Sequence, residues 1–360
     1  MSWNNVKGVS SAQIWTDNAN MSQAYLFANG NHQVKLTIGV SLTLSDPTQP
    51  GPTEDEVKTA LSLINFETGA DLSFLKPGNK GSYAYVYQPN VSEKVKSIEV
   101  TSDSSTYQYE FDYYVSSDST INADYASEKV ALLLSYTNAS GDKIEYYTAS
   151  GSKSQSYVAV TVYPPKKYGM LGSTMTAVIF KNFDAQPNYT LDISSFVDTF
   201  IVHSVYIYGL AIDDPYFRFV SYQAPDTRLS PTPFRQIIES NYSTGQTPGY
   251  RLSQGFLLKH NDVKSMGKSY IADVAVMEKD TEKNEPDGEI AALHVTVYQS
   301  TGQIIFINFD VDVSWTNNQN DTLFKESASA KFTAYDQFGN PAHIEVGAGN
   351  STTLSLSSVS

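Results

Sequence analysis

The sequence contains no cysteine and carries little basic charge. It has 24 Lys and Arg residues against 38 Asp and Glu residues, which gives a formal net charge of −14 at pH 7. Without cysteine there are no disulfides, thiolate nucleophiles or Cys-ligated zinc sites. Affinity for nucleic acid comes mostly from Lys and Arg that neutralise phosphates, and the chain has no basic run. We therefore expect no nucleic-acid partner.

Long apolar runs are also missing. The first residues, Met1 to Gly8, show neither the basic start nor the apolar stretch of a signal peptide. No later segment predicts a transmembrane helix. We expect a protein made without a signal peptide, either cytoplasmic or released by lysis or a dedicated secretion system. The lack of cysteine fits a reducing cytosol and equally a Cys-free bacterial or viral surface protein.

Charged residues make up only 17% of the chain, whereas 41% is hydrophobic. Such a chain is too apolar to be disordered and predicts a surface of Ser, Thr, Asn and Tyr. Its 360 residues favour two domains. The strand-like segment 154–163 ends at Pro164-Pro165, which removes two backbone donors and indicates a stiff linker. We predict an N-terminal domain at 1–165 and a C-terminal domain at 166–360.

Period-two alternation of apolar and polar residues is the main local signal, and it predicts strands. The most regular examples are Val34–Leu44 and Ile305–Trp315, and in Tyr107–Tyr113 the tyrosines and Phe111 are expected on one buried face. Further strands or strand pairs are expected at Tyr83–Gln88, Val130–Tyr136 with Lys143–Thr148, Phe196–Ile212, Tyr270–Met277 with Glu289–Tyr298, and Lys331–Tyr335 with His343–Val346. These patterns predict an all-β protein of two tandem antiparallel β-sandwiches, Ig-like or jelly-roll-like.

Helix signals are few. Thr53 to Glu56 has the form of a capping box and predicts one short helix. Residues 225–248 have the composition of a long surface loop, in which Pro233–Glu239 is a candidate for one helical turn. The segment Asp336-Gln-Phe-Gly-Asn-Pro341 resembles a turn that recurs in bacterial Ig-like repeats, and this resemblance covers six residues.

Residues that could perform chemistry are scattered. The five histidines lie far apart, and no hydrolase, zinc-protease, Walker or dinucleotide motif is present. Asp310 and Asp312 share one face of a strand, about 7 Å apart, and are the candidate metal ligands or acid–base pair. A solvated strand face explains the same pattern. We expect no catalytic residue and no cofactor.

Tyrosine is abundant, with 25 residues. Tyrosine combines an apolar ring with a hydroxyl and has few rotors to immobilise, so surface tyrosine among Ser, Asn and Gly favours molecular recognition. Tyrosine is also a good strand former. Four aromatic residues are our candidate ligand contacts: Tyr146, Tyr147, Tyr216 and Trp315.

Three hypotheses for function follow. The first is a non-enzymatic recognition protein, comparable to an adhesin, lectin or toxin, that binds a cell-surface glycan or protein through Tyr- and Asn-rich loops. The second is a β-pore-forming toxin that acts on membranes, because residues 97–140 alternate in a way that suits a membrane hairpin. The third is a carbohydrate hydrolase whose two carboxylates are brought together by the fold. Homo-oligomers are compatible with all three.

Overall fold

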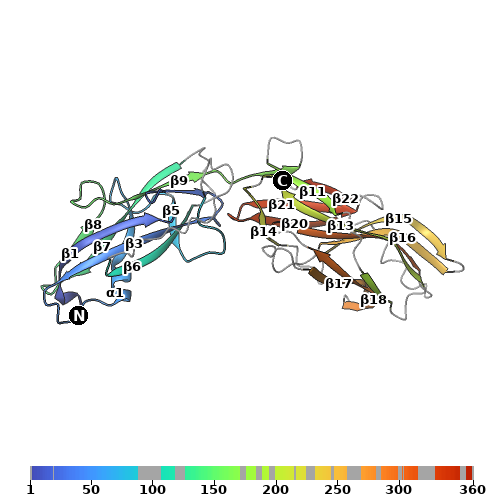
Figure 1. The fold of residues 1–360 in the computed structure, drawn as a ribbon, viewed down its shortest axis with the longest axis horizontal. Helices are drawn as coiled ribbons and strands as arrows, with labels where there is room; N and C mark the ends of the chain where they lie inside the picture. Colours follow the sequence, from blue (N-terminus) through green and yellow to red (C-terminus); the bar gives the residue numbers. More distant parts are fainter. Residues whose placement is uncertain are drawn as a thin grey trace. The chain divides into compact units, whose positions relative to one another are not determined.

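The structure is a computed structural model that describes residues 2–18, 20–87, 107–117, 126–170, 176–183, 189–193, 199–214, 216–223, 232–244, 247–257, 269–280, 285–298, 302, 304–314, 329–348 and 354–358. For most of 170–328 this description covers the backbone alone. Strands dominate it, and the prediction of an all-β protein is confirmed. Contacts divide the chain into two compact units (Figure 1). Unit 1 holds residues 1–166 with 338–340, and unit 2 holds 167–337 with 341–360. The expected domain boundary at residue 165 stays a prediction.

The part of unit 1 that the structure describes forms two sheets. Sheet A has the strand order β1 (Val6–Thr16), β3 (Gln33–Leu44), β6 (Tyr109–Ser117), β5 (Leu75–Gly78), and all its pairs are antiparallel. Sheet B has the order β2 (Gln23–Phe27), β9 (Val158–Tyr163), β7 (Ala126–Thr137), β4 (Leu61–Asn65), with β8 (Lys143–Tyr147) beside β7. Strands β2 and β9 are parallel, and the other pairs of sheet B are antiparallel. The β7–β8 hairpin confirms the expected pair.

The two sheets of unit 1 contribute to one hydrophobic core. Alternate residues of each strand point into it, which is the arrangement that period-two patterns predict. Its fully buried members include Leu26, Leu36, Ile38, Val115, Val130, Leu132, Leu134, Val158 and Val160. The intervening residues form outer faces that point away from this core. On the outer face of sheet B lies a small satellite cluster of buried residues: Ile64, Phe66, Ala131 and Ala149.

The helices of unit 1 are short: η1 (Ser2–Asn5) and α1 (Glu54–Ala60). The N-terminus of α1 has the predicted capping box. The Glu56 N–H donates to the Thr53 hydroxyl, and the Thr53 N–H donates to the Glu56 carboxylate at 2.8 Å. Val57 anchors the helix to the core. Among the described residues no helix is long and apolar enough to cross a membrane.

The described residues of unit 2 form three sheets. The first has the order β10 (Tyr168–Met170), β11 (Thr176–Phe183), β13 (Thr199–Ile212), β19 (Ile304–Ser314), β16 (Thr247–Leu257), β15 (Thr232–Thr244). The second has the order β12 (Tyr189–Ile193), β18 (Glu285–Tyr298), β17 (Ser269–Asp280). The third has the order β14 (Phe219–Gln223), β20 (Ser329–Asp336), β21 (Pro341–Ala348), β22 (Leu354–Ser358). The expected β17–β18 and β20–β21 pairs are confirmed, and so are the expected strands β13 and β19.

Three local expectations were wrong. Pro233–Glu239 is not a helical turn but lies in β15, which pairs with β16 where a long loop was expected, because its Phe and Ile residues favour a strand. Residues 83–87 form no strand. Tyr107 precedes β6, and its ring lies over Gly39 on the outer face of sheet A, whereas Phe111 points into the core.

A buried hydrogen bond joins two strands of unit 2. The Tyr168 hydroxyl donates to the Asp336 carboxylate at 2.6 Å, and both side chains are buried. Burial and the negative charge of Asp336 raise the pKa of Tyr168, so its hydroxyl stays protonated and able to donate. Asp336 is the first residue of the turn noted in the sequence, and its carboxylate therefore ties this turn to β10.

We expect Tyr168→Phe to lower the free energy of unfolding of unit 2 by about 2 kcal/mol, because a charge-assisted hydrogen bond is lost while the carboxylate stays buried. Urea unfolding followed by circular dichroism measures this. The matched control is Tyr335→Phe, since the Tyr335 hydroxyl makes a longer, exposed bond of 3.3 Å to Gln223. Equal losses in the two variants would contradict the prediction.

Candidate functional site

The loop that follows β4 is held in place by a buried carboxylate. Glu128 in β7 is only 3% exposed. Its Oε1 accepts hydrogen bonds from the Asn65 side-chain amide at 2.9 Å and from the Ser73 N–H at 2.8 Å, and its Oε2 accepts from the Phe74 N–H at 3.4 Å. A buried carboxylate is stable when donors surround it, so these bonds fix the two ends of the loop to β7.

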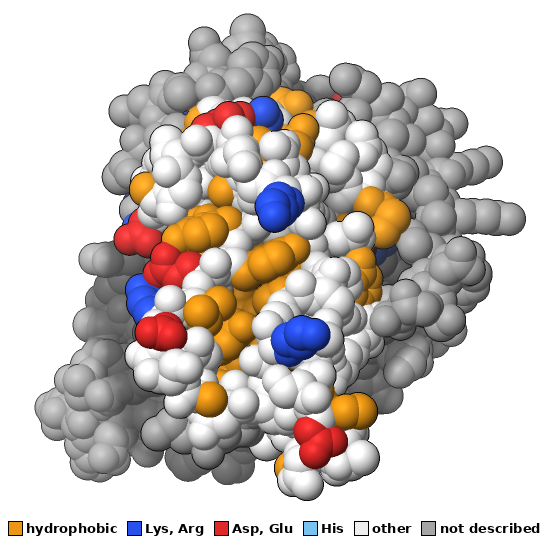
Figure 2. Space-filling model, turned by 90° about the vertical axis from the view of Figure 1, so that its left-hand side faces the viewer, with side chains coloured by type: hydrophobic (Ala, Val, Ile, Leu, Met, Phe, Trp, Pro, Cys, Tyr) orange, Lys and Arg blue, Asp and Glu red, His pale blue; other side chains and the backbone are white. Residues whose placement is uncertain are grey.

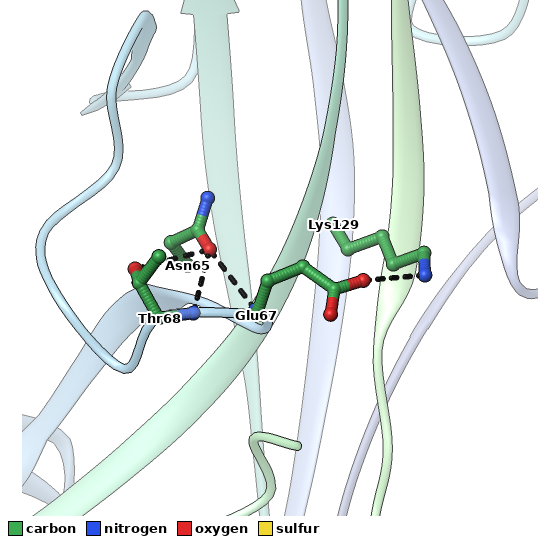
Figure 3. Close-up of polar contacts among 4 residues, drawn as sticks. All are labelled: Asn65, Glu67, Thr68 and Lys129. Carbon is green, nitrogen blue, oxygen red and sulfur yellow. Dashed lines mark hydrogen bonds and ion pairs between the residues drawn. The ribbon is translucent and has the colours of Figure 1, made fainter.

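Asn65 organises the turn inside this loop. Its Oδ1 accepts from the N–H groups of Glu67 and Thr68 at 3.0 and 3.1 Å and from the Thr68 hydroxyl at 3.2 Å (Figure 3). Gly69 follows with φ +70°, which a glycine adopts without strain, and its N–H donates to the Asn65 carbonyl at 2.8 Å. The turn therefore presents the Glu67 side chain in a fixed direction, toward β7.

Four residues meet on the outer face of sheet B: Phe66, Glu67, Lys129 and Tyr157, here called the Tyr157 cluster. Lys129 Nζ lies 2.6 Å from Glu67 Oε1 (Figure 3). The same ammonium lies 5.1 Å from the centroid of the Tyr157 ring and 5.6 Å from that of Phe66. The two rings are 4.5 Å apart and tilted by 46°. Phe66 is buried, whereas Tyr157 is 37% exposed.

Lys129 of the Tyr157 cluster keeps its positive charge near neutral pH. The hydrogen bond from Lys129 to Glu67, together with the charge of that carboxylate, raises the pKa of Lys129. The ammonium therefore faces both rings as a permanent cation, a favourable geometry for cation–π attraction. Exposed ion pairs add little to folding stability. The arrangement instead places an exposed Tyr ring beside one donor and one acceptor group.

Tyr147, a predicted contact residue, lies on the same face as this cluster. It pairs with Leu133 of β7, is 37% exposed, and donates its hydroxyl to Glu145. Tyr147 and Tyr157 flank the paired residues Thr148 and Ser156, whose backbones are joined by a hydrogen bond of 3.1 Å. The neighbouring Tyr146 points to the other side of β8 and packs, half-buried, against the core.

The other predicted contact and metal residues lie in unit 2. Tyr216 is half-buried; its N–H donates to Asp214 at 3.0 Å and its ring contacts Phe217 edge-on. Trp315 lies outside the described residues. Asp310 and Asp312 lie in β19, where the described backbone pairs Asp312 with Arg251 of β16. Their side chains are outside the description.

Within the described ranges, no three His, Asp or Glu side chains gather into a possible metal site. His32 is fully buried, and its Nδ1 accepts the Phe27 N–H at 2.9 Å. His343 is exposed, with Nδ1 3.0 Å from the Thr333 hydroxyl. These two histidines therefore have structural neighbours, as expected for strand and loop residues.

Figure 2 shows unit 1 from the side on which the N-terminus and α1 lie in Figure 1. Apolar side chains, tyrosine included, gather in a band across this face, with basic side chains beside it and acidic ones near its border. Among the described residues, the most exposed large apolar side chains of the chain are Met21, Val86, Tyr147 and Tyr157. All four belong to unit 1.

No family model matches the chain, and no curated protein matches it. The surface of unit 1 is therefore the basis for assigning a function.

The sequence did not single out Phe66, Glu67 or Lys129. Phe66 and Glu67 stand before the turn signal at Thr68-Gly69, and Lys129 is one polar residue in an alternating strand. Their convergence depends on the β4–β7 register, which places Asn65 opposite Val130. The one available signal was the alternation in Tyr157–Tyr163, which places Tyr157 on the outer face.

Proposed function

We propose that this protein is a non-enzymatic recognition protein, built from two tandem antiparallel β-sandwiches, that binds a cell-surface glycan through the Tyr157 cluster. The observation that carries the proposal is the exposed Tyr157 ring, which packs against the Phe66 ring and lies near the Lys129 ammonium, whose partner is the Glu67 carboxylate. Two sheets that enclose one core in unit 1 support the sandwich architecture.

The chemistry of the cluster suits a sugar. A pyranose offers an apolar C–H face and a rim of hydroxyls that both donate and accept hydrogen bonds. The Tyr157 ring offers an apolar face, Lys129 offers donors and Glu67 offers acceptors, all within one small area. The ring already packs against Phe66 and Lys129 before binding, so we expect little conformational entropy to be lost when a ligand stacks on it. A protein receptor is the alternative outcome of the tests.

We expect Tyr157→Ala to weaken glycan binding by about tenfold to a hundredfold, because an exposed aromatic anchor contributes most of the contact at such sites. The measurement is a glycan array followed by calorimetry with the glycans retained by the wild type. Tyr157→Phe keeps the ring and is expected to retain most of the affinity. Tyr25→Ala is the matched control, because Tyr25 is a half-buried tyrosine of the same sheet outside the cluster.

A blank glycan array, combined with a blank pull-down on target-cell membranes, would count against the proposal. Retention of a membrane protein on the wild type but not on Tyr157→Ala would favour the protein receptor instead.

No described observation favours the two alternative functions. The hairpin that the pore-forming hypothesis requires would join β6 and β7, but β6 pairs in sheet A and β7 in sheet B. Dye release from liposomes made of target-cell lipid tests this hypothesis directly. The hydrolase hypothesis requires two carboxylates across a groove, and Glu128, the buried Glu of unit 1, is enclosed by donors from its own chain.

A further inference from the structure

The outer face of sheet A carries a second group of aromatic and charged side chains, here called the Trp15 face: Trp15, Asp17, Lys35, Tyr107, Asp112 and Tyr114. The register of the sheet brings them together. Trp15 in β1 is opposite Thr37 in β3, and Thr37 is opposite Asp112 in β6. Lys35, which precedes Thr37 by two residues in β3, is opposite Tyr114 in β6. The face therefore spans three neighbouring strands on the side away from the core.

An ion cluster occupies the middle of the Trp15 face. Lys35 Nζ lies 3.3 Å from Asp17 Oδ2 and 3.3 Å from Asp112 Oδ1. The Thr37 hydroxyl donates to Asp112 Oδ1 at 3.1 Å. The two carboxylate side chains are 44% and 46% exposed, so both acceptors reach the solvent, while Lys35 keeps them in place. The cluster bears two negative charges and one positive charge.

Two aromatic pairs flank the ion cluster. On one side, Trp15 and Tyr107 stack with centroids 5.7 Å apart and planes 28° apart. The Tyr107 ring lies directly on the sheet at Gly39, where an added Cβ would come within 2.5 Å of it. On the other side, the rings of Tyr114 and Tyr85 are 5.1 Å apart. Strand geometry places the Cα atoms of Trp15 and Tyr114 about 12 Å apart, a span that suits a short chain of sugar rings.

We propose that the Trp15 face is a second binding site of unit 1, with a neutral oligosaccharide as its ligand. The aromatic pairs offer two stacking surfaces, and the ion cluster between them offers acceptors and a donor for hydroxyls. Its net negative charge opposes sialylated or phosphorylated glycans, because like charges repel at short range. The site rests on the proposed function for the class of ligand, and it lies on the opposite outer face of unit 1 from the Tyr157 cluster, so the two sites would bind separate ligands.

The test is ¹⁹F NMR of the full chain labelled with 5-fluorotryptophan. The sequence holds three tryptophans, and Trp15→Phe assigns the Trp15 resonance. The probes are chito-, cello-, malto- and N-acetyllactosamine oligosaccharides, with sialyllactose as the charged comparison. We expect a saturable shift of the Trp15 resonance with a neutral probe and a constant Trp3 resonance. Lys35→Met should weaken this binding about tenfold or more, because the donor is lost and two carboxylates are left to repel each other.

Several outcomes would overturn the inference: an unmoved Trp15 resonance with every neutral probe, a response to sialyllactose alone, or unchanged affinity in Lys35→Met. The two sites fail independently. If Tyr157→Ala abolishes array binding while the Trp15 resonance stays fixed, the proposed function stands and the second site is refuted. If the Trp15 resonance responds fully in Tyr157→Ala and array binding is unchanged, the second site stands and the Tyr157 proposal is refuted.

Discussion

Unit 1 is expected to lose stability on acidification, with His32 as the main single cause. The His32 ring is fully buried, and desolvation lowers its pKa to about 3, against 6.5 for a free histidine. Since the unfolded chain takes up the proton near pH 6.5, stability is complete above that pH and falls as the pH drops from 6.5 toward 3. The slope is about 1.4 kcal/mol per pH unit, so the loss is roughly 2–3 kcal/mol by about pH 4.5.

The surroundings of His32 explain why it stays neutral. Its Nδ1 accepts the Phe27 N–H, so the ring proton is on Nε2, which has no hydrogen-bond partner among the described residues. The rings of Phe27 and Phe338, both within unit 1, lie 5.6 and 4.9 Å from the imidazole centroid. A second proton would place a charge among these rings, and no described carboxylate acts on it.

The measurement is urea unfolding between about pH 7 and pH 4.5 in a Trp315→Phe background, so that the fluorescence reports on Trp3 and Trp15 of unit 1. His32→Asn keeps an acceptor for the Phe27 N–H and removes the titrating ring. We expect it to be less stable at pH 7, because the ring packing is lost, but to show a flatter pH dependence. The matched control, His343→Asn, changes an exposed histidine and should leave the wild-type slope. Parallel curves for the wild type and His32→Asn would refute the assignment.

Glu128→Ala is expected to destabilise unit 1 by about 3 kcal/mol. The substitution removes the buried acceptor of three part-buried donors, the Asn65 amide and the N–H groups of Ser73 and Phe74. Glu128→Gln keeps one acceptor oxygen but turns an amide donor toward the loop, so an intermediate loss is expected. The same unfolding assay measures both variants.

The Glu128 prediction has a second readout, because the loop it anchors carries Phe66 and Glu67. Hydrogen exchange at the Glu67 and Thr68 amides should accelerate in Glu128→Ala, and glycan affinity should fall with it. Glu145→Gln is the control, since Glu145 is exposed and pairs with Lys143 at the surface. Unchanged exchange at these two amides would show that Glu128 does not hold the loop.

Local patterns predicted those elements that depend on local chemistry. The strands β3 and β19 followed from period-two alternation, and α1 followed from the capping box at Thr53 and Glu56. Pro233–Glu239 was misassigned because proline and polar residues outweighed its Phe and Ile residues, although pairing with β16 decides the conformation. The residues at 83–87 resemble a strand in composition but form no strand.

The groups of side chains that meet on each surface could not be predicted from the sequence, because they depend on the register between paired strands. In the sequence, Tyr107 belongs to the same alternating pattern as Tyr109, Phe111 and Tyr113. In the structure it lies before β6, and its ring packs on Gly39. Lys35 and Asp112 lie on different strands 77 positions apart, and only the β3–β6 pairing brings them together. The Tyr157 cluster and the Trp15 face both consist of residues from different segments of the chain. The period-two alternation in the sequence therefore predicts which residues point outward, but not which of them contact one another.

The parallel pairing of β2 with β9 has a consequence for biosynthesis. β2 ends at residue 27, whereas its partner spans residues 158–163, so the ribosome must make most of unit 1 before the edge of sheet B can close. The hydrogen bond from the Ile14 N–H of β1 to the Ser156 hydroxyl likewise cannot form until residue 156 has been synthesised. Nascent chains that stop before β9 should remain open to proteolysis and chaperone capture, and protection should arise abruptly once β9 has emerged from the exit tunnel.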